Sequence, residues 1–221
     1  MDFDFSPIFD NWGFLAQGLW ITIELSVATM VAATLVGIAL ALGRIYGPVW
    51  LRVPLTFYVD SMRAIPVLVV LVWTFFAFPL LTGITLPPFW AALAALTLHI
   101  AAFASEILRA GLASIRPGQV RAARALGMSG AQIVRKILFP QAVVRMLPAY
   151  GSLLSVTIKD TAIASVIAVP ELMRQSETIS AQTFRPIEVF TTAMLVYFLI
   201  LFPVTRAVEA FYRRVAHLGR S

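Results

Sequence analysis

The chain has 221 residues, of which 60% are hydrophobic and only 13% are charged. A soluble domain is ordinarily about 45–50% apolar and about 25% charged, so this composition excludes an ordinary soluble protein and indicates a polytopic membrane protein. The net charge of +6 does not indicate a nucleic-acid partner, because the arginines flank apolar runs instead of forming one basic face. Since the chain has no cysteine, disulfides and thiolate chemistry are excluded.

The first eleven residues are acidic, with Asp2, Asp4 and Asp10 and no basic residue. A secretory signal begins with positive charge before its apolar core, so we expect no cleaved signal and an N-terminus on the outer, periplasmic side. The first membrane helix is predicted over residues 18–43. It is crowded with Ala, Gly and Ser, which membrane helices use to pack closely because lipid provides no hydrophobic drive for association.

No charged residue occurs between Arg63 and Glu106, a stretch long enough for two crossings of a hydrocarbon core about 30 Å thick. The sequence TGITLPP at 82–88 interrupts this stretch with residues typical of a turn. Helix two is therefore predicted over residues 55–81 and helix three over 89–112. Helix four follows at 147–170, with Lys159 and Asp160 near its middle, and a polar connection leads to helix five at 187–208.

These elements predict an all-α integral membrane protein with five transmembrane helices, organised as a single domain over residues 1–221. Five crossings place the two ends on opposite sides of the membrane, and the excess of basic residues on cytoplasmic segments gives the orientation. The connection at 44–52, the loop at 113–140 and the tail through Arg220 are basic, so we assign them to the cytoplasm. Only Arg174 and Arg185 then lie on outer connections.

The loop at 113–140 is too charged to cross a bilayer, yet its apolar residues have helical spacing. A first short helix is predicted over 119–126, ended by Gly127 in a left-handed conformation. A second is predicted to begin at a capping box of Ser129 and Gln132 and to stop at Pro140. Such an element either docks on another protein or lies on lipid headgroups, attracted by its arginines.

The segment GQVRAARALGMSGAQIVRKILFPQA resembles the so-called EAA loop of permease subunits in bacterial ABC importers. It is most similar to the polar amino-acid subfamily, which includes histidine, glutamine, arginine, glutamate and opine permeases. Residues 58–71, 105–119 and 158–172 resemble further blocks of that subfamily, in the same order. Two positions depart from the loop pattern, since Arg121 stands in place of Glu and Phe139 in place of Leu.

The resemblance implies a coupling loop between helices three and four that contacts a dimer of ABC ATPase subunits. It also implies a second permease subunit, identical or paralogous, a periplasmic or lipid-anchored substrate-binding protein, an amino-acid substrate and a place in the bacterial inner membrane. No Gly-x-x-x-x-Gly-Lys phosphate loop occurs, so ATP and Mg are expected on the partner, with no cofactor, metal or catalytic residue here. The residues expected to couple to the ATPase are Gly118, Gln119, Arg121, Ala122, Ala123, Leu126, Gly127 and Pro140.

Ionisable side chains at membrane depth tend to face the bundle interior or a wet cavity. The candidates for lining the substrate pathway are Arg63, His99, Lys159 and Asp160, with the adjacent Thr161. An ion pair between Asp160 and Arg63 is expected, which would leave Lys159 for a substrate carboxylate and would favour glutamate or aspartate.

Glu106 and Arg109 lie three residues apart and are expected to pair near the cytoplasmic surface.

Two other functions remain open at this point. A secondary transporter would ordinarily show internal repeats, and none is visible. An intramembrane serine hydrolase would rely on Ser152 or Ser155 with His99, but no nucleophile elbow surrounds either serine.

Overall fold

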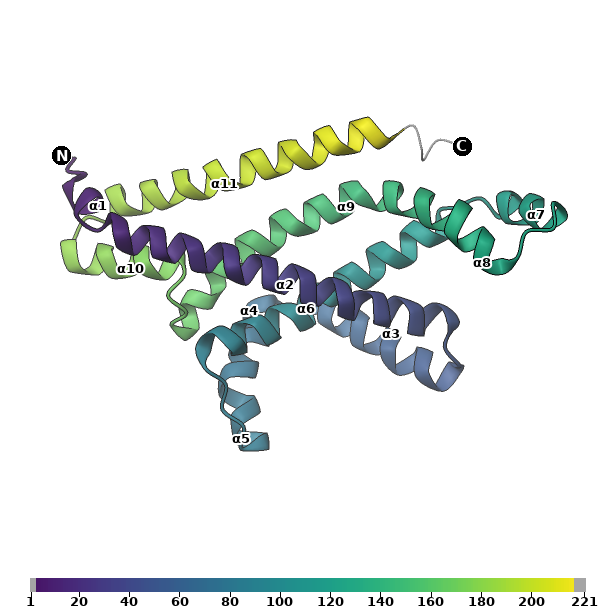
Figure 1. The fold of residues 1–221 in the computed structure, drawn as a ribbon. Helices are drawn as coiled ribbons and strands as arrows, with labels where there is room; N and C mark the ends of the chain where they lie inside the picture. The colour runs from purple at the N-terminus through teal and green to yellow at the C-terminus, as the bar shows by residue number, and fades with distance from the viewer. Residues whose placement is uncertain (1–2, 217–221) are drawn as a thin grey trace.

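The computed structural model describes residues 3–216, and over that range the chain forms helices joined by short connections (Figure 1). Asp2 and Arg220, which contributed to the orientation above, lie outside the described residues. The elements in chain order are α1 (Ser6–Asp10), α2 (Trp12–Tyr46), α3 (Val49–Ala64), α4 (Val67–Val72), the π-helical turn η1 (Trp73–Ala77), α5 (Phe78–Thr82), α6 (Pro88–Ala113), α7 (Pro117–Ala125), α8 (Gly130–Ile133), the π-helical turn η2 (Val134–Leu138), α9 (Phe139–Asp160), the 3-10 helix η3 (Thr161–Ile167), α10 (Leu172–Thr183) and α11 (Pro186–Val215).

Four segments of the described chain are long and apolar enough to cross a membrane: α2, α6, the run Gly130–Ile167 and α11. A fifth candidate is the pair Val49–Ala64 and Val67–Thr82, which is bent by 109°. The predicted helices at 18–43, 89–112 and 187–208 fall within α2, α6 and α11. The predicted all-α membrane fold is therefore confirmed.

The prediction of one continuous helix over 55–81 is wrong. The chain breaks at Ile65, whose φ of −88° and ψ of 133° are extended. Pro66 follows, and a proline disfavours the helical conformation of the residue before it. As Figure 1 shows, the chain therefore turns away from the line of α3. α4 packs against α6, with Leu71 fully buried, and α5 projects from the bundle.

Two π-helical turns occur within residues 3–216, and each ends directly before a Phe-Pro pair. η1 precedes Phe78-Pro79, and η2 precedes Phe139-Pro140. A proline lacks the N–H for the helical bond and crowds the carbonyl four residues earlier, and a widened turn relieves both conflicts. The prediction that Pro140 stops the second loop helix is therefore wrong. Pro140 lies in the first turn of α9, which continues directly from η2.

The predicted helix four ends earlier than expected as an α-helix. α9 stops at Asp160, and the following 3-10 helix ends at Ile167, directly before Ala168, which has a left-handed φ of 61°. Lys159 and Asp160 therefore lie at the end of α9, inside the candidate span Gly130–Ile167. The next segment, predicted as a polar connection, contains α10, whose Leu172, Gln175, Ser176 and Ile179 are buried on one face.

The core between α2 and α6 is built from small residues, as predicted. A Cβ added to Gly37 would lie 2.8 Å from the Cβ of Ala104 and 3.1 Å from the backbone nitrogen of Ser105. Ala33, Ala101 and Ala104 are buried at the same interface. Close backbone approach of this kind is how helices associate in lipid.

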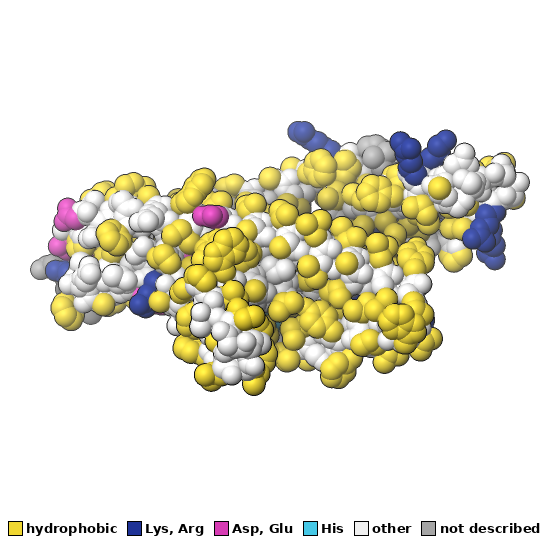
Figure 2. Space-filling view, turned by 60° about the horizontal axis from the view of Figure 1, so that its bottom comes forward, with side chains coloured by type: hydrophobic (Ala, Val, Ile, Leu, Met, Phe, Trp, Pro, Cys, Tyr) yellow, Lys and Arg dark blue, Asp and Glu magenta, His cyan; other side chains and the backbone are white. Residues whose placement is uncertain are grey.

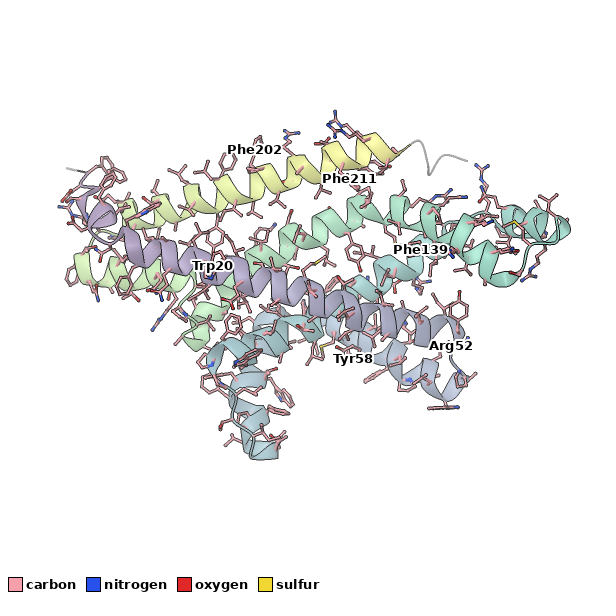
Figure 3. All side chains as sticks on the ribbon, viewed as in Figure 1. Trp20, Arg52, Tyr58, Phe139, Phe202 and Phe211 are labelled. Atoms are coloured by element: carbon pink, nitrogen blue, oxygen red, sulfur yellow. The ribbon has the colours of Figure 1, made fainter. Side chains whose placement is uncertain are left out.

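The two ends of the bundle differ in charge. α1, α10 and the start of α11 lie at one end, and α7, α8 and the far part of α11 lie at the other (Figure 1). Figure 2 shows most of the visible Lys and Arg side chains towards the second end, with Asp and Glu mainly towards the first. Between the ends, large apolar side chains are exposed, among them Trp20 at 66% and Phe211 at 55% (Figure 3). This pattern suits a bundle surrounded by hydrocarbon with its basic end in the cytoplasm.

Candidate functional site

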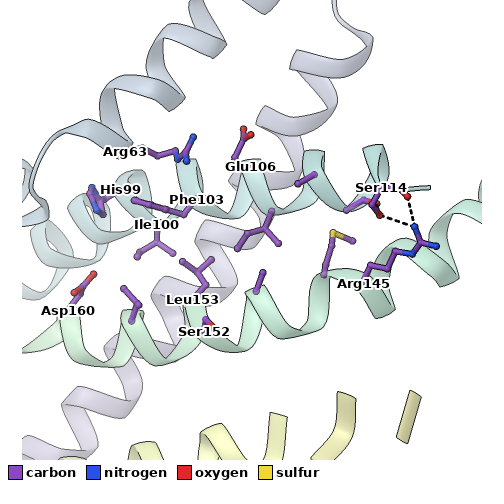
Figure 4. A pocket seen from close by; sticks show the side chains of 16 residues that line it. Arg63, His99, Ile100, Phe103, Glu106, Ser114, Arg145, Ser152, Leu153 and Asp160 are labelled. Atoms are coloured by element: carbon purple, nitrogen blue, oxygen red, sulfur yellow. Dashed lines mark hydrogen bonds between the residues drawn. The ribbon is translucent and has the colours of Figure 1, made fainter. Parts of the chain in front are cut away.

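A pocket of about 550 Å³ lies between α6 and α9, with the end of α3 at its rim (Figure 4). Its walls are mainly apolar, and its polar groups include Arg63, His99, Glu106, Ser152 and Asp160. Mostly apolar pockets with a few placed polar groups are typical of small-molecule sites. Sequence reasoning proposed Arg63, His99 and Asp160 for the pathway, and the structure brings these three to one pocket.

Arg63 and His99 share one aromatic neighbour. The guanidinium carbon of Arg63 lies 5.8 Å from the ring centre of Phe103, and the His99 ring centre lies 5.3 Å from the same ring. The Arg63 side chain is therefore held beside the pocket by a cation–π contact. Buried His99 Nδ1 has no hydrogen-bond partner within residues 3–216, so it is free to bond a molecule in the pocket.

The residues at the end of α9 point in different directions. Asp160 faces the pocket, whereas Lys159 is exposed on the outside of the single chain. Thr161 is fully buried, and its hydroxyl donates to the carbonyl of Ile158 at 2.7 Å. The expected Arg63–Asp160 ion pair is not formed in the described chain, because Arg63 packs on Phe103 of α6 instead. Both charges remain available to a ligand.

Glu106 forms the centre of an ion-pair cluster at the other end of the pocket. It pairs with Arg109, as predicted, and also accepts a hydrogen bond from Arg44 Nη1 at 3.0 Å. Arg44 in turn lies 3.3 Å from the hydroxyl of Thr56, so the cluster joins α2, α3 and α6. The Arg44 contact was missed, because a pairing between helices has no spacing along the chain.

Arg145 of α9 joins the end of α6. Its Nη1 donates to the carbonyl oxygen of Ser114 and lies 3.3 Å from the Ser114 hydroxyl (Figure 4). Ser114 is the C-cap of α6, and α7 begins three residues later. Both side chains line the pocket, so the loop that follows α6 is connected through this contact to both pocket walls.

The two short loop helices form as predicted. α7 is followed by Gly127 with a left-handed φ of 78°, a conformation that favours glycine. Ser129 caps α8, with its hydroxyl accepting from Gln132 N at 3.3 Å and its own N–H donating to Gln132 Oε1 at 2.8 Å. This reciprocal pair is a complete capping box.

The expected coupling residues differ in exposure. Gly118, Arg121, Ala122, Leu126, Gly127 and Pro140 are exposed, Gln119 is half-buried and Ala123 is buried. Ala123 therefore packs inside the loop in the described chain, and the coupling role of these residues stays a prediction. The side chain of Leu126 is 82% exposed, and no acidic residue occurs between Glu106 and Asp160. The loop therefore combines exposed arginines with exposed apolar side chains, namely Leu126, Val134 and Phe139.

The two serines considered for nucleophilic catalysis bond to their own helix. Ser152 Oγ donates to the carbonyl of Pro148 and Ser155 Oγ to that of Gly151, each at 3.1 Å. Neither hydroxyl bonds to His99, so no activated nucleophile is assembled in the described chain.

Comparison with known proteins places this arrangement among transport components. Residues 33–217 match the family described as binding-protein-dependent transport system inner membrane component. The chain is 35% identical to an octopine transport system permease protein of Rhizobium meliloti, over 91% of this chain and 86% of that protein. It is 33% identical to an arginine transport system permease protein of Bacillus subtilis, over 97% and 98% of the two chains. It is 31% identical to a glutamine transport system permease protein of Escherichia coli strain K12, over 97% and 99%.

Solved structures agree with the sequence comparison. A chain in a crystal structure of an amino acid ABC transporter with histidines superposes with a TM-score of 0.90. It is 31% identical, and the match covers 97% of this chain and 100% of that one. A methionine ABC transporter in an inward-facing conformation shares the fold at a TM-score of 0.78 and 22% identity.

Proposed function

The chain belongs to the inner membrane components of binding-protein-dependent transport systems and is a non-catalytic permease subunit of an amino-acid ABC importer, and from that premise we propose how its pocket and loop divide the work. Membership implies ATPase and substrate-binding partners. We propose that the basic end faces the cytoplasm of a bacterial cell, with α1 and α10 on the periplasmic side of the inner membrane. This orientation rests on the excess of arginines at the α7–α8 end.

The pocket is proposed as the place where the amino acid passes through the chain. Arg63 and Asp160 carry opposite charges on its wall without pairing with each other, which suits the carboxylate and ammonium groups of a zwitterion. His99 Nδ1 supplies a further polar contact. This arrangement of two unpaired opposite charges in one pocket is the observation that carries the proposal.

Among amino acids, glutamate or aspartate is the more specific proposal. It rests on Arg63 together with Lys159, which is exposed on α9. A lysine at membrane depth does not face lipid without cost, so we propose that a second permease subunit, identical or paralogous, covers it beside the pathway. The relatives above are named for glutamine, arginine and octopine, so a panel of substrates is needed to test this choice.

The loop at 113–140 is proposed as the contact with the ATPase dimer. ATP-driven closure of the ATPase moves α7, and the Ser114–Arg145 contact carries the displacement to α9 and so to the pocket walls. The bundle then alternates between inward-open and outward-open arrangements. Because Arg121 and its neighbours are cationic and residues 107–159 contain no Asp or Glu, we expect acidic residues in the ATPase groove that accepts the loop.

The proposal is tested by ATP-driven uptake in proteoliposomes that contain the permease, its ATPase and its binding protein. A panel of labelled glutamate, aspartate, glutamine, arginine and cystine identifies the substrate. Arg63→Gln should reduce uptake at least about tenfold, since a lost charge-assisted contact is worth about 1.5–3 kcal/mol. The matched control is Arg52→Gln, an exposed arginine on the same helix that does not line the pocket. Equal uptake by the two variants would contradict a pathway role for Arg63.

A further inference from the structure

Glu171 is a fully buried carboxylate at the end of the bundle opposite to the loop. It lies between η3 and α10, and its residue is 0% exposed. No Lys, Arg or His side chain of residues 3–216 forms an ion pair with it. Buried charges are ordinarily paired, so a carboxylate of this kind needs a different explanation.

Hydrogen-bond donors from α10 and α11 converge on this carboxylate, and Thr22 of α2 lies beside it. On α10, the backbone N–H of Arg174 donates to Oε1 at 2.7 Å and that of Met173 donates to Oε2 at 2.8 Å, which caps the helix. On α11, the Tyr197 hydroxyl donates to Oε2 at 3.1 Å. On α2, the Thr22 hydroxyl oxygen lies 3.5 Å from Oε2 and accepts from Leu172 N at 3.1 Å. Glu171 and Thr22 together therefore join α2, α10 and α11.

The backbone packing around Glu171 is equally close. A Cβ added to Gly18 of α2 would lie 3.0 Å from Leu172 Cα and 3.1 Å from the carbonyl carbon of Glu171. The chain reaches this point directly from η3, which continues α9 beyond the pocket residue Asp160. The contact therefore fixes where the outer end of the pocket helix lies against the rest of the bundle.

Three ionisable groups surround Glu171. They are Tyr197 on α11, Glu177 on α10, and Arg174 on α10, whose side chain pairs with Glu177 at 3.4 Å. Burial raises the pKa of the Glu171 carboxyl from its ordinary value of 4.5 to about 7, against the opposing effect of its donors. A proton on Oε2 can be donated to the Tyr197 oxygen, because a phenol both donates and accepts.

We propose that Glu171 is a positioning residue for the outer end of the pathway, and that opening of the α2–α10–α11 joint exposes its carboxyl to water and releases its proton to the outer medium. The transport part rests on the proposed import function, whereas the joint itself does not. Glu171 has its higher pKa in the closed joint, so protonation of Glu171 stabilises the closed joint. This stabilisation is complete below pH 4.5 and is lost as the pH rises through about 7. With those two pKa values, the opening equilibrium is about tenfold larger at pH 8 than at pH 6.

The test is hydrogen–deuterium exchange of α10 amides in the assembled complex in lipid nanodiscs, at pH 6 and pH 8 and corrected for intrinsic rates. The wild-type protection should fall about tenfold between the two pH values. Glu171→Gln should abolish that dependence. The matched control Glu177→Gln removes the same charge from the same helix and should retain it, with the transition at slightly lower pH because Glu177 raises the pKa of Glu171.

Tyr197→Phe provides a second reading if Glu171→Gln fails to assemble. Loss of a donor to the charged form should move the transition to higher pH, a direction that a purely structural defect does not predict. Protection that is independent of pH in the wild type, or equally dependent in Glu171→Gln, would overturn the proposal. In proteoliposomes, wild-type uptake relative to Glu171→Gln should rise between external pH 6 and pH 8. Absence of uptake in every variant would count against the import function. The hydrogen–deuterium exchange result would then still test whether Glu171 controls opening of the joint.

Discussion

Replacing Gly127 by Asp should separate the docking role of the loop from its folding. Gly127 follows α7 with a φ of 78°, and a Cβ added there meets no atom within 4 Å. The substitution therefore causes no steric clash in the chain itself. Its cost is the left-handed backbone, roughly 1 kcal/mol for Asp, whose short polar side chain tolerates this region. A loss of that size lowers a melting temperature by only a few degrees.

Gly83 provides a control with matched backbone strain. It has a φ of 73°, also meets nothing within 4 Å, and lies after α5 at the predicted outer connection. Gly83→Asp should therefore lower the melting temperature as much as Gly127→Asp does. Only Gly127→Asp places a bulky charged side chain on the surface that is proposed to contact the ATPase.

The assay is retention of the ATPase subunit through purification, followed by ATP hydrolysis and uptake in proteoliposomes. Moving a transporter from 1:99 to 99:1 between two conformations requires about 5.5 kcal/mol of differential binding, so a loosened contact transmits little. Gly127→Asp should lose uptake while ATP hydrolysis by any bound ATPase continues, and Gly83→Asp should keep the two coupled. Normal uptake by Gly127→Asp would refute the docking role of this loop.

Three further predictions follow from single contacts. Glu106→Gln leaves the Arg44 side chain, which is only 9% exposed, without its anion and should cost about 3 kcal/mol of stability in detergent. Arg109→Gln, at a position that is 44% exposed, should cost under about 1 kcal/mol. Equal melting temperatures of the two variants would contradict the central role of Glu106 in the ion-pair cluster. Lys159→Ala should raise the apparent KM for an acidic amino acid without changing that for a neutral one, and unchanged uptake of both would remove Lys159 from the pathway. Gly18→Ala forces a Cβ to within 3.0 Å of Leu172 Cα and should destabilise the protein by about 1–3 kcal/mol. Gly13→Ala, on the same helix, meets nothing within 4 Å and should leave the stability unchanged. Comparable thermal unfolding of the two variants would show that α2 and α10 adjust freely.

Local features of the chain were predictable in detail. The apolar runs identified α2, α6 and α11, the capping box at Ser129 was confirmed, and Gly127 adopts the expected left-handed conformation. The loop pattern also led to the correct family despite Arg121. Each of these depends on residues close together in sequence, where hydrophobic periodicity and capping chemistry act directly.

Other features were mispredicted because two local effects compete. Pro140 read as a helix stop and Pro66 as part of a helix, whereas the structure continues through the first and breaks at the second. A π-helical turn precedes Pro140 and none precedes Pro66, whereas Pro54, Pro148 and Pro203 lie inside helices without such a turn. Sequence alone does not say which prolines a π-helical turn will accommodate, because the neighbouring helices must supply the packing that stabilises such a turn.

The sequence by itself determined that this chain crosses a membrane, that its basic loop lies between the third and fourth spans, and that it carries no nucleotide-binding motif. Only the tertiary structure decided that Arg44 completes the Glu106 cluster, that Lys159 points away from the pocket that holds Arg63 and Asp160, and that Glu171 and Thr22 together join α2, α10 and α11. The physical reason is that periodicity gives the face on which a side chain lies. Its partners depend on how the helices rotate and cross, which close packing of small residues fixes only in the assembled bundle.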